Sequence, residues 1–166
     1  IPSDKPVIFI PDQHLGNYVQ SQTGREMILW RGYCPTHQHI LASDIKQRKA
    51  VYPNARVVVH PECSTEVVAM ADQVASTSGI LKYCKESAEK EFIIGTEIGI
   101  LHRLRRENPD KIFIEASALA DCPNMKLNTL EKILWSLEDM VYRITVPADI
   151  ARQALGSIQR MIQVSP

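Results

Sequence analysis

The sequence predicts an α/β fold in which parallel sheets are layered with helices. Four short apolar stretches have the length and composition of buried strands, and helical patterns lie between them. The strands are expected at residues 7–10, 57–59, 91–94 and 111–114, and the helices at residues 44–51, 65–71, 79–87, 99–107, 129–139 and 147–164. Strands that alternate with helices pair in parallel, so the loops that follow them open at the carboxyl edge of the sheet, where ligands usually bind.

Local signals mark the ends of several of these helices. Ser43 and Ser64 precede helical stretches, as N-cap residues do. Pro147 stands in a first helical turn, where its missing N–H costs nothing. Pro53 and Pro109 follow predicted helix ends, because proline cannot continue a helix. The spacing of these signals agrees with the apolar periodicity.

The composition is typical of a globular protein. Hydrophobic residues make up 45% and charged residues 23% of the 166 residues. Nineteen basic and nineteen acidic side chains cancel, and basic residues are scattered apart from the run 103–106, which argues against a nucleic-acid partner. The longest apolar runs are far shorter than the roughly 20 residues that a membrane-spanning helix needs. We therefore expect no membrane span.

The four cysteines are Cys34, Cys63, Cys84 and Cys122. They are widely spaced, and we expect no signal peptide before them, which favours a reducing compartment. No pair has Cys-x-x-Cys spacing, so a metal site would have to gather its ligands from distant parts of the chain. The chain begins at Ile1 without an initiator methionine and soon enters a strand, so we expect the start to be a cut end.

A weak internal repeat gives two of the cysteines equivalent positions. Residues 7–34 and 92–122 share one order of features: apolar strand, polar corner, helix, apolar strand, loop, cysteine. A rotation that relates the two copies would bring their loops together, and with them Cys34 and Cys122.

Two polar segments combine residues suited to chemistry. Cys34, His37 and His39 place a thiol and two imidazoles within six residues, which suits zinc or an iron–sulfur cluster. Packing of Cys34 as a small buried side chain is the alternative. His60 and Glu62 follow the predicted strand 57–59 and could act as acid and base. From the pattern alone, a turn that caps the next helix explains them as well.

The remaining candidates are weaker. Residues 76–79 place three hydroxyls and a glycine at a helix start, which could bind a carboxylate or phosphate but is also an ordinary N-cap. We interpret Cys84 and His102 as structural because both fall within helical patterns. Cys63 has no equivalent in the repeat, and the role of His14 is left open.

Taken in order, these motifs resemble the quinolinate synthase family over nearly the whole chain. The resemblance rests on residues 11–16, 27–30, Cys34 with His37, 60–63, 76–79, 95–97 and 122–125. It implies three similar α/β units around a pseudo-threefold axis, of which this chain would hold about one and a half. Residues 1–33 would end a middle unit, residues 34–121 would form a complete unit, and residues 122–166 would be a helical segment that returns to the cluster face.

The resemblance also implies a cofactor. Each unit of the family gives one cysteine to a single 4Fe-4S cluster, and Cys34 and Cys122 match two of these ligands. The third cysteine is expected upstream of this chain, as is a Tyr-Val-Asn substrate segment. Three ligands leave one iron open to act as a Lewis acid.

The implied reaction makes quinolinate from iminosuccinate and dihydroxyacetone phosphate in NAD biosynthesis. Substrate contacts are expected from His60, the backbone of Pro61, Glu62 and Thr77, with His37 near the cluster. Glu62 is the expected base, and His60 would hold a carboxylate or shuttle protons. His14 departs from the family pattern, since many members have Asn there.

We expect the isolated chain to be inactive, because part of the site is missing. L-aspartate oxidase is an expected upstream partner, and the expected location is a bacterial cytoplasm or, in a plant, the plastid stroma. Two alternatives come from other classes. One is a zinc hydrolase built from His37, His39, His60 and Glu62, and the other is a non-catalytic dicarboxylate-binding module.

Overall fold

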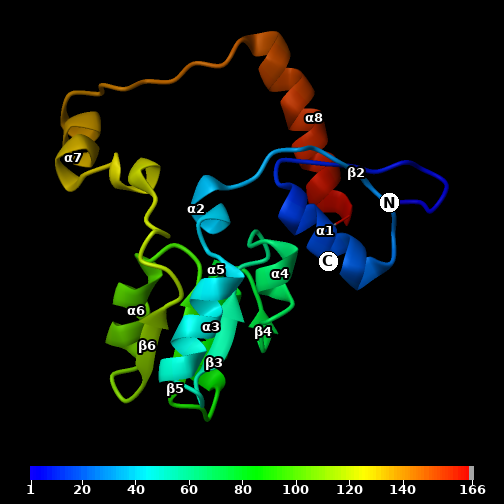
Figure 1. Ribbon diagram of the computed structural model, residues 1–166. Helices are drawn as coiled ribbons and strands as arrows, with labels where there is room; N and C mark the ends of the chain where they lie inside the picture. The colour runs from blue at the N-terminus through cyan, green and yellow to red at the C-terminus, as the bar shows by residue number, and fades with distance from the viewer. Residues whose placement is uncertain (165–166) are drawn as a thin grey trace. The chain divides into compact units, whose positions relative to one another are not determined.

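The computed structural model describes residues 1–164 and divides the chain into two compact units. The first unit comprises residues 1–122, and the second begins at Pro123. All the strands among the described residues lie in the first unit, with helices beside them (Figure 1). Every strand pair is parallel, which confirms the predicted α/β class. The predicted division at residues 33 and 121 stays a prediction.

The larger sheet has four strands in the order β4-β3-β5-β6. These strands are β3 (Arg56–Val59), β4 (Gln73–Val74), β5 (Glu91–Gly95) and β6 (Ile112–Glu115). Val59 is the register partner of both Val74 and Gly95. Because the strands are parallel, the residues that follow these positions all emerge at one edge of the sheet.

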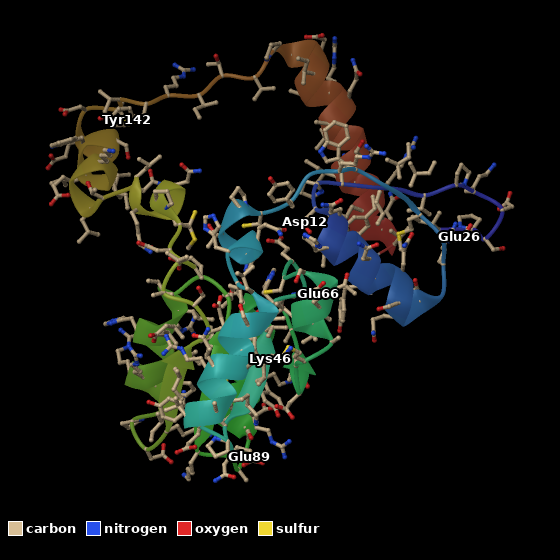
Figure 2. All side chains as sticks on the ribbon, in the orientation of Figure 1. Asp12, Glu26, Lys46, Glu66, Glu89 and Tyr142 are labelled. Atoms are coloured by element: carbon tan, nitrogen blue, oxygen red, sulfur yellow. The ribbon has the colours of Figure 1, made fainter. Side chains whose placement is uncertain are left out.

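Both faces of this sheet are buried, as is usual for parallel sheets. Side chains of β3 alternate between two apolar clusters, with Val57 and Val59 in one and Val58 in the other. Helices α3 (Ala42–Val51) and α4 (Thr65–Val68) contribute to the first cluster, and α5 (Thr77–Glu86) and α6 (Ile100–Glu107) to the second. Helix α3 buries Ile45 and exposes Lys46, whose side chain Figure 2 labels. The helices therefore cover opposite faces.

The smaller sheet pairs β1 (Ile8–Phe9) with β2 (Ile28–Leu29). Helix α1 (Gln13–Thr23) packs on it through Gly16, where an added Cβ would lie 2.6 Å from Leu29 Cδ2. A strand lies within residues 7–10 as predicted, but the prediction that it is buried was wrong, because Ile8 is 71% exposed. Two strands with a helix on one side leave half of their side chains uncovered.

Two predictions about local structure had different outcomes. Ser64 caps α4 as expected, since its side chain accepts a hydrogen bond from Val67 N. Ser43, in contrast, lies inside α3, whose N-cap is Leu41. Asp44 Oδ2 accepts the backbone N–H of Leu41 at 3.0 Å and so satisfies the helix start in its place. The short helix α2 (Pro35–Gln38) and strand β4 were not predicted at all.

The second unit consists of helices joined by irregular chain. It contains a 3₁₀ turn at Pro123–Lys126, α7 (Leu130–Glu138) and α8 (Ala148–Val164). Thr129 caps α7 by accepting a hydrogen bond from Lys132 N at 3.3 Å. Both helices begin and end within one residue of the predicted bounds. No helix among residues 1–164 combines the length and apolar character needed to cross a membrane.

Candidate functional site

The carboxyl edge of the four-stranded sheet gathers the polar side chains of the site. His60 follows β3, and its backbone N–H donates to Gly95 O at 2.9 Å, which continues the β3–β5 ladder by one bond. The turn after His60 is held by the Cys63 N–H, which donates to His60 O at 3.0 Å. The Cys63 thiol also donates to Gly95 O at 3.3 Å. This turn fixes Glu62 beside the end of β5.

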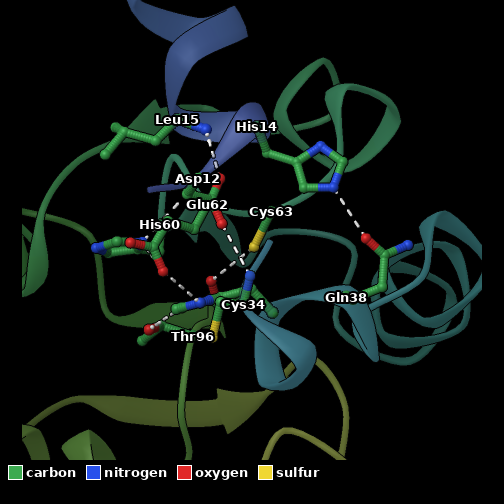
Figure 3. Close-up of polar contacts among 11 residues, drawn as sticks. Asp12, His14, Leu15, Cys34, Gln38, His60, Glu62, Cys63 and Thr96 are labelled. Carbon is green, nitrogen blue, oxygen red and sulfur yellow. Dashed lines mark hydrogen bonds and ion pairs between the residues drawn. The ribbon is translucent and has the colours of Figure 1, made fainter. Parts of the chain in front are cut away.

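His37 reaches the same edge from α2. Its Nε2 lies 2.9 Å from Thr96 Oγ1 in a hydrogen bond. Thr96, which is labelled in Figure 3, follows β5 directly. His37 Nδ1 lies 3.1 Å from Glu62 Oε2. The two atoms are close without the alignment of a hydrogen bond, so Nδ1 is buried with no hydrogen-bond partner. His37 therefore joins two loops that are far apart in the sequence.

The two histidines of the site stack on each other. The ring centroids of His37 and His60 are 4.6 Å apart, and the rings are inclined by 16°. Burial, with a smaller contribution from the neighbouring His60, lowers the pKa of His37 to about 4. Burial also lowers the pKa of His60. Both imidazoles are therefore uncharged at neutral pH and can act as hydrogen-bond donors or acceptors.

Glu62 lies beside these two histidines, and its carboxyl group binds a proton more readily than usual. Burial raises the pKa of the carboxyl group, and the negative charge of Asp12 raises it further. Its Oε2 lies 3.9 Å from His60 Nδ1, and the Glu62 N–H donates to the same nitrogen at 3.3 Å. A carboxylate that accepts a proton more readily than usual is suited to act as a general base.

Two buried carboxylates hold the backbones of Cys34 and Cys122. Asp12 Oδ2 accepts the Cys34 N–H at 2.8 Å, and its Oδ1 accepts the N–H of Leu15 at the start of α1. Glu97 Oε1 accepts the Cys122 N–H at 3.4 Å, and its Oε2 accepts the N–H of Gly99 just before α6. These acids occupy equivalent polar corners of the repeat, and neither role was predicted from the sequence.

The cysteines differ in what they can bind. Cys34 and Cys122 are partly exposed and come after strands β2 and β6, whereas Cys63 and Cys84 are buried. Burial raises the pKa of each buried thiol to about 12, so both stay protonated and are poor ligands. The donor chemistry of Cys34 and Cys122 therefore fits two thiolate ligands of an iron–sulfur cluster.

One group of side chains has the arrangement of metal ligands. Cys34, His37 and Glu62 each offer one ligand atom, and these atoms lie within 4.8 Å of one another. His39 is exposed at the end of α2 and is outside the group. The sequence suggested a different ligand set, made of His37, His39, His60 and Glu62. Among residues 1–164, that set does not come together as a metal site.

The other predicted residues are placed as follows. Pro61 is buried in the turn between His60 and Glu62. Thr77 is exposed and is the first residue of α5. The preceding residue, Ser76, is the N-cap, and its side chain accepts a hydrogen bond from the Gly79 N–H at 3.3 Å. Within the described part of the chain, no hydrogen bond or ion pair joins Thr77 to His37 or Glu62.

His14 and His102 lie outside this group. His14 Nε2 makes a 2.9 Å hydrogen bond to Gln38 Oε1, which ties α1 to α2. His102 is exposed on α6.

Comparison with known proteins gives one consistent result. A family model described as "Quinolinate synthetase A protein" matches residues 1–163. A quinolinate synthase of Dehalococcoides mccartyi is 50% identical over 159 residues, which are 96% of this chain and 53% of that protein. Quinolinate synthases of Thermodesulfovibrio yellowstonii and Nostoc punctiforme are 48% and 44% identical, over 94% and 99% of this chain and 52% of each relative. The chain thus spans about half the length of the curated relatives it matches.

Proposed function

Because the chain belongs to the quinolinate synthetase A protein family, we propose that it supplies part of the active site of a quinolinate synthase. In this proposal, iminosuccinate and dihydroxyacetone phosphate condense to quinolinate, a step of NAD biosynthesis. L-aspartate oxidase would supply the first substrate, and the reducing cytoplasm or plastid stroma would be the location. The support comes from the family and from the side chains at the carboxyl edge of the sheet.

Cys34 and Cys122 are the proposed ligands of a 4Fe-4S cluster. Their positions after equivalent strands and their partial exposure support this assignment. The third thiolate would come from a segment outside this chain. When bound, such a cluster with an open iron supplies a Lewis acid that polarises a substrate oxygen.

Glu62 is the proposed base for the proton that is lost during dehydration. Its raised pKa supports this role, because a stronger base removes a carbon-bound or nitrogen-bound proton more readily. His37 lies 3.1 Å from Glu62 Oε2 and is the proposed relay for that proton. An uncharged imidazole can accept a proton at one nitrogen and release one from the other.

We assign His60 and the helix start at Thr77 to the binding of negatively charged substrate groups. His60 and the Pro61 backbone would orient a substrate carboxylate, since both lie in the turn beside Glu62. Thr77 follows β4, whose last residue Val74 pairs with Val59, so it emerges at the same edge as His60. Holding the anion at two points would reduce the freedom of the reacting atoms.

The observation that carries the proposal is the convergence of His37, His60 and Glu62 within one hydrogen-bonded corner beside Cys34. A chimera tests it, in which this chain replaces the matching half of the Dehalococcoides mccartyi relative. We expect the chimera, purified without oxygen, to be brown and to form quinolinate. Glu62→Gln should lower the turnover rate by about 100-fold or more while the cluster absorption remains.

The exposed carboxylate Glu66 provides the matched control. Glu66→Gln should leave turnover unchanged. A chimera that carries the cluster but forms no quinolinate would contradict the proposal, as would equal activity of the two glutamine variants. The chain alone, supplied with iron and sulfide, should form no quinolinate.

A further inference from the structure

We propose that Cys34, His37 and Glu62 bind a single zinc ion, and that this ion excludes an iron–sulfur cluster from Cys34. The zinc site rests on the geometry of these three side chains. Only the competition between zinc and the cluster for Cys34 rests on the proposed function. The inference therefore adds a second, mutually exclusive metal state to the same corner of the molecule.

The spacing of the donors is close to that of a zinc site. All three ligand atoms lie within 4.8 Å of one another, and His37 Nδ1 is 3.1 Å from Glu62 Oε2. Tetrahedral zinc with bonds of about 2.0–2.3 Å separates its ligands by roughly 3.3–3.8 Å. Movements of about 1 Å, within the reach of side-chain rotation, would close the site around the ion.

His37 is prepared to act as a ligand. Its side chain is only 9% exposed, and Nδ1 is buried without a hydrogen-bond partner. In the tautomer in which Nε2–H donates to Thr96 Oγ1, Nδ1 carries a lone pair and lies 3.1 Å from Glu62 Oε2. Histidines that bind metals commonly hold their second ring nitrogen on such a partner. A buried lone pair without a donor is costly, and a cation would satisfy it.

The donor set selects the ion. Thiolate, imidazole and carboxylate together suit zinc, whereas magnesium and calcium prefer oxygen ligands alone. A Cys34 thiolate and a Glu62 carboxylate would bring two negative charges to the divalent ion, with a neutral His37 between them. Three protein ligands leave a fourth position for water. On binding, the Cys34 thiol releases its proton to solvent, and no electron transfer is needed.

Occupancy by zinc has a direct consequence for the proposed reaction. Cys34 cannot serve zinc and a cluster as an ordinary ligand at the same time, and Glu62 bound to zinc is no longer available as a base. Cys122 is not among the three side chains whose ligand atoms lie within 4.8 Å of one another, so the zinc site does not include it. Zinc would therefore hold the protein in an inactive state until it is removed.

Cobalt titration of the metal-free full chain tests the inference. We expect one Co²⁺ per chain with a thiolate-to-cobalt absorption band, and stoichiometric displacement by Zn²⁺. Cys34→Ser should abolish the band, and His37→Asn and Glu62→Gln should each weaken binding by at least about tenfold. Cys122→Ser is the matched thiol control and should bind Co²⁺ with unchanged affinity.

A second measurement does not depend on the variants folding. In the unsubstituted chain labelled with ¹⁵N, saturating Zn²⁺ should shift the NMR resonance of His37 Nδ1 far more than that of Nε2. Thr96→Val should weaken Co²⁺ binding by about 10- to 100-fold, and Thr96→Ser should restore it because the hydroxyl returns.

Three results would overturn the inference: no thiolate band, an unchanged affinity in His37→Asn, or a loss in Cys122→Ser equal to that in Cys34→Ser. The chimera described above separates this failure from failure of the proposed function. Cys122→Ser should prevent cluster assembly in the chimera while leaving Co²⁺ binding by the chain intact.

Discussion

Asp12 is hydrogen-bonded to the backbone of Cys34 at 2.8 Å while it caps helix α1 with its other oxygen. Asp12 is only 3% exposed, and both bonds are partly shielded from solvent. Charge-assisted bonds to backbone N–H groups are stronger than neutral ones. The start of α1 and the position of Cys34 therefore depend on one side chain.

Asp12→Ala should lower the free energy of unfolding by about 2 kcal/mol or more, because it removes a helix cap and leaves the Cys34 N–H unpaired. Urea denaturation measures this loss. Amide hydrogen exchange at Cys34 should become faster in the same variant. Asp12→Asn keeps the shape and one acceptor oxygen, so its loss should be smaller. Unchanged exchange at Cys34 in Asp12→Ala would show that the bond does not hold the loop.

Glu97 should behave as the equivalent of Asp12 in the second copy of the repeat. Glu97→Ala frees the backbone N–H groups of Gly99 and Cys122 and should cost about 1–3 kcal/mol of unfolding free energy. Glu107→Ala is the control, since Glu107 is a surface residue that pairs with Arg103, and its effect should stay within about 0.5 kcal/mol. Equal losses in the two variants would contradict a special role for Glu97.

The stability of the metal-free chain should fall in mild acid. Burial lowers the pKa of His37 from 6.5 to about 4, so the unfolded chain binds a proton at this residue more readily than the folded chain does. The free energy of unfolding is therefore unaffected by His37 above pH 6.5 and falls as the pH decreases toward 4. At pH 5 the loss attributable to His37 is about 2 kcal/mol. The lowered pKa of His60 acts in the same direction, whereas the raised pKa of Glu62 opposes it.

Urea denaturation at pH 7.5 and pH 5 isolates the His37 contribution when it is compared between variants. His37→Gln should reduce the difference in unfolding free energy between the two pH values. His102→Gln should leave that difference unchanged, because His102 is exposed on α6. A pH dependence that is identical in all three proteins would contradict the pKa assigned to His37.

Gly95 allows the close approach of β3 and β5 at the site. An added Cβ would lie 2.8 Å from Val59 Cγ1 and 3.2 Å from Val59 Cβ, so Gly95→Ala should cost about 1–3 kcal/mol. The Gly95 carbonyl also accepts the His60 N–H, so the substitution should change the NMR signals of the His60 ring. Gly156→Ala is the control. Nothing lies within 4 Å of its added Cβ, and the change should raise the helix content of α8.

Several elements of the fold could be predicted because their signals are local. The apolar run at residues 57–59 and the two later strands were located within one residue, since each is bounded by turn residues. Burial of residues 7–10 could not be predicted in the same way. It depends on which other segments cover the strand, and Ile8 is exposed although its local pattern is that of a core strand.

The candidate site was predicted in parts but not as a whole. His37 with Cys34 and His60 with Glu62 were found as separate groups, because each lies within a few residues of sequence. Their meeting depends on the register of β3 and β5 and on the contact of His37 with Thr96, which is 59 residues away. Contacts between residues so far apart in the chain cannot be recognised from the local sequence pattern. The roles of Asp12 and Glu97 were missed for the same reason.

In the parallel sheet of β3, β5 and β6, the site lies at one end of the strands and exposed turns lie at the other. The turns at residues 53–54 and 109–110 are exposed and lead into β3 and β6 at the end opposite the site. Extra residues inserted there would be accommodated by the turn without changing the pairing of Val59 with Gly95. Fluorescent labels or affinity tags can therefore be attached at these turns while the corner formed by His37, His60 and Glu62 keeps its geometry.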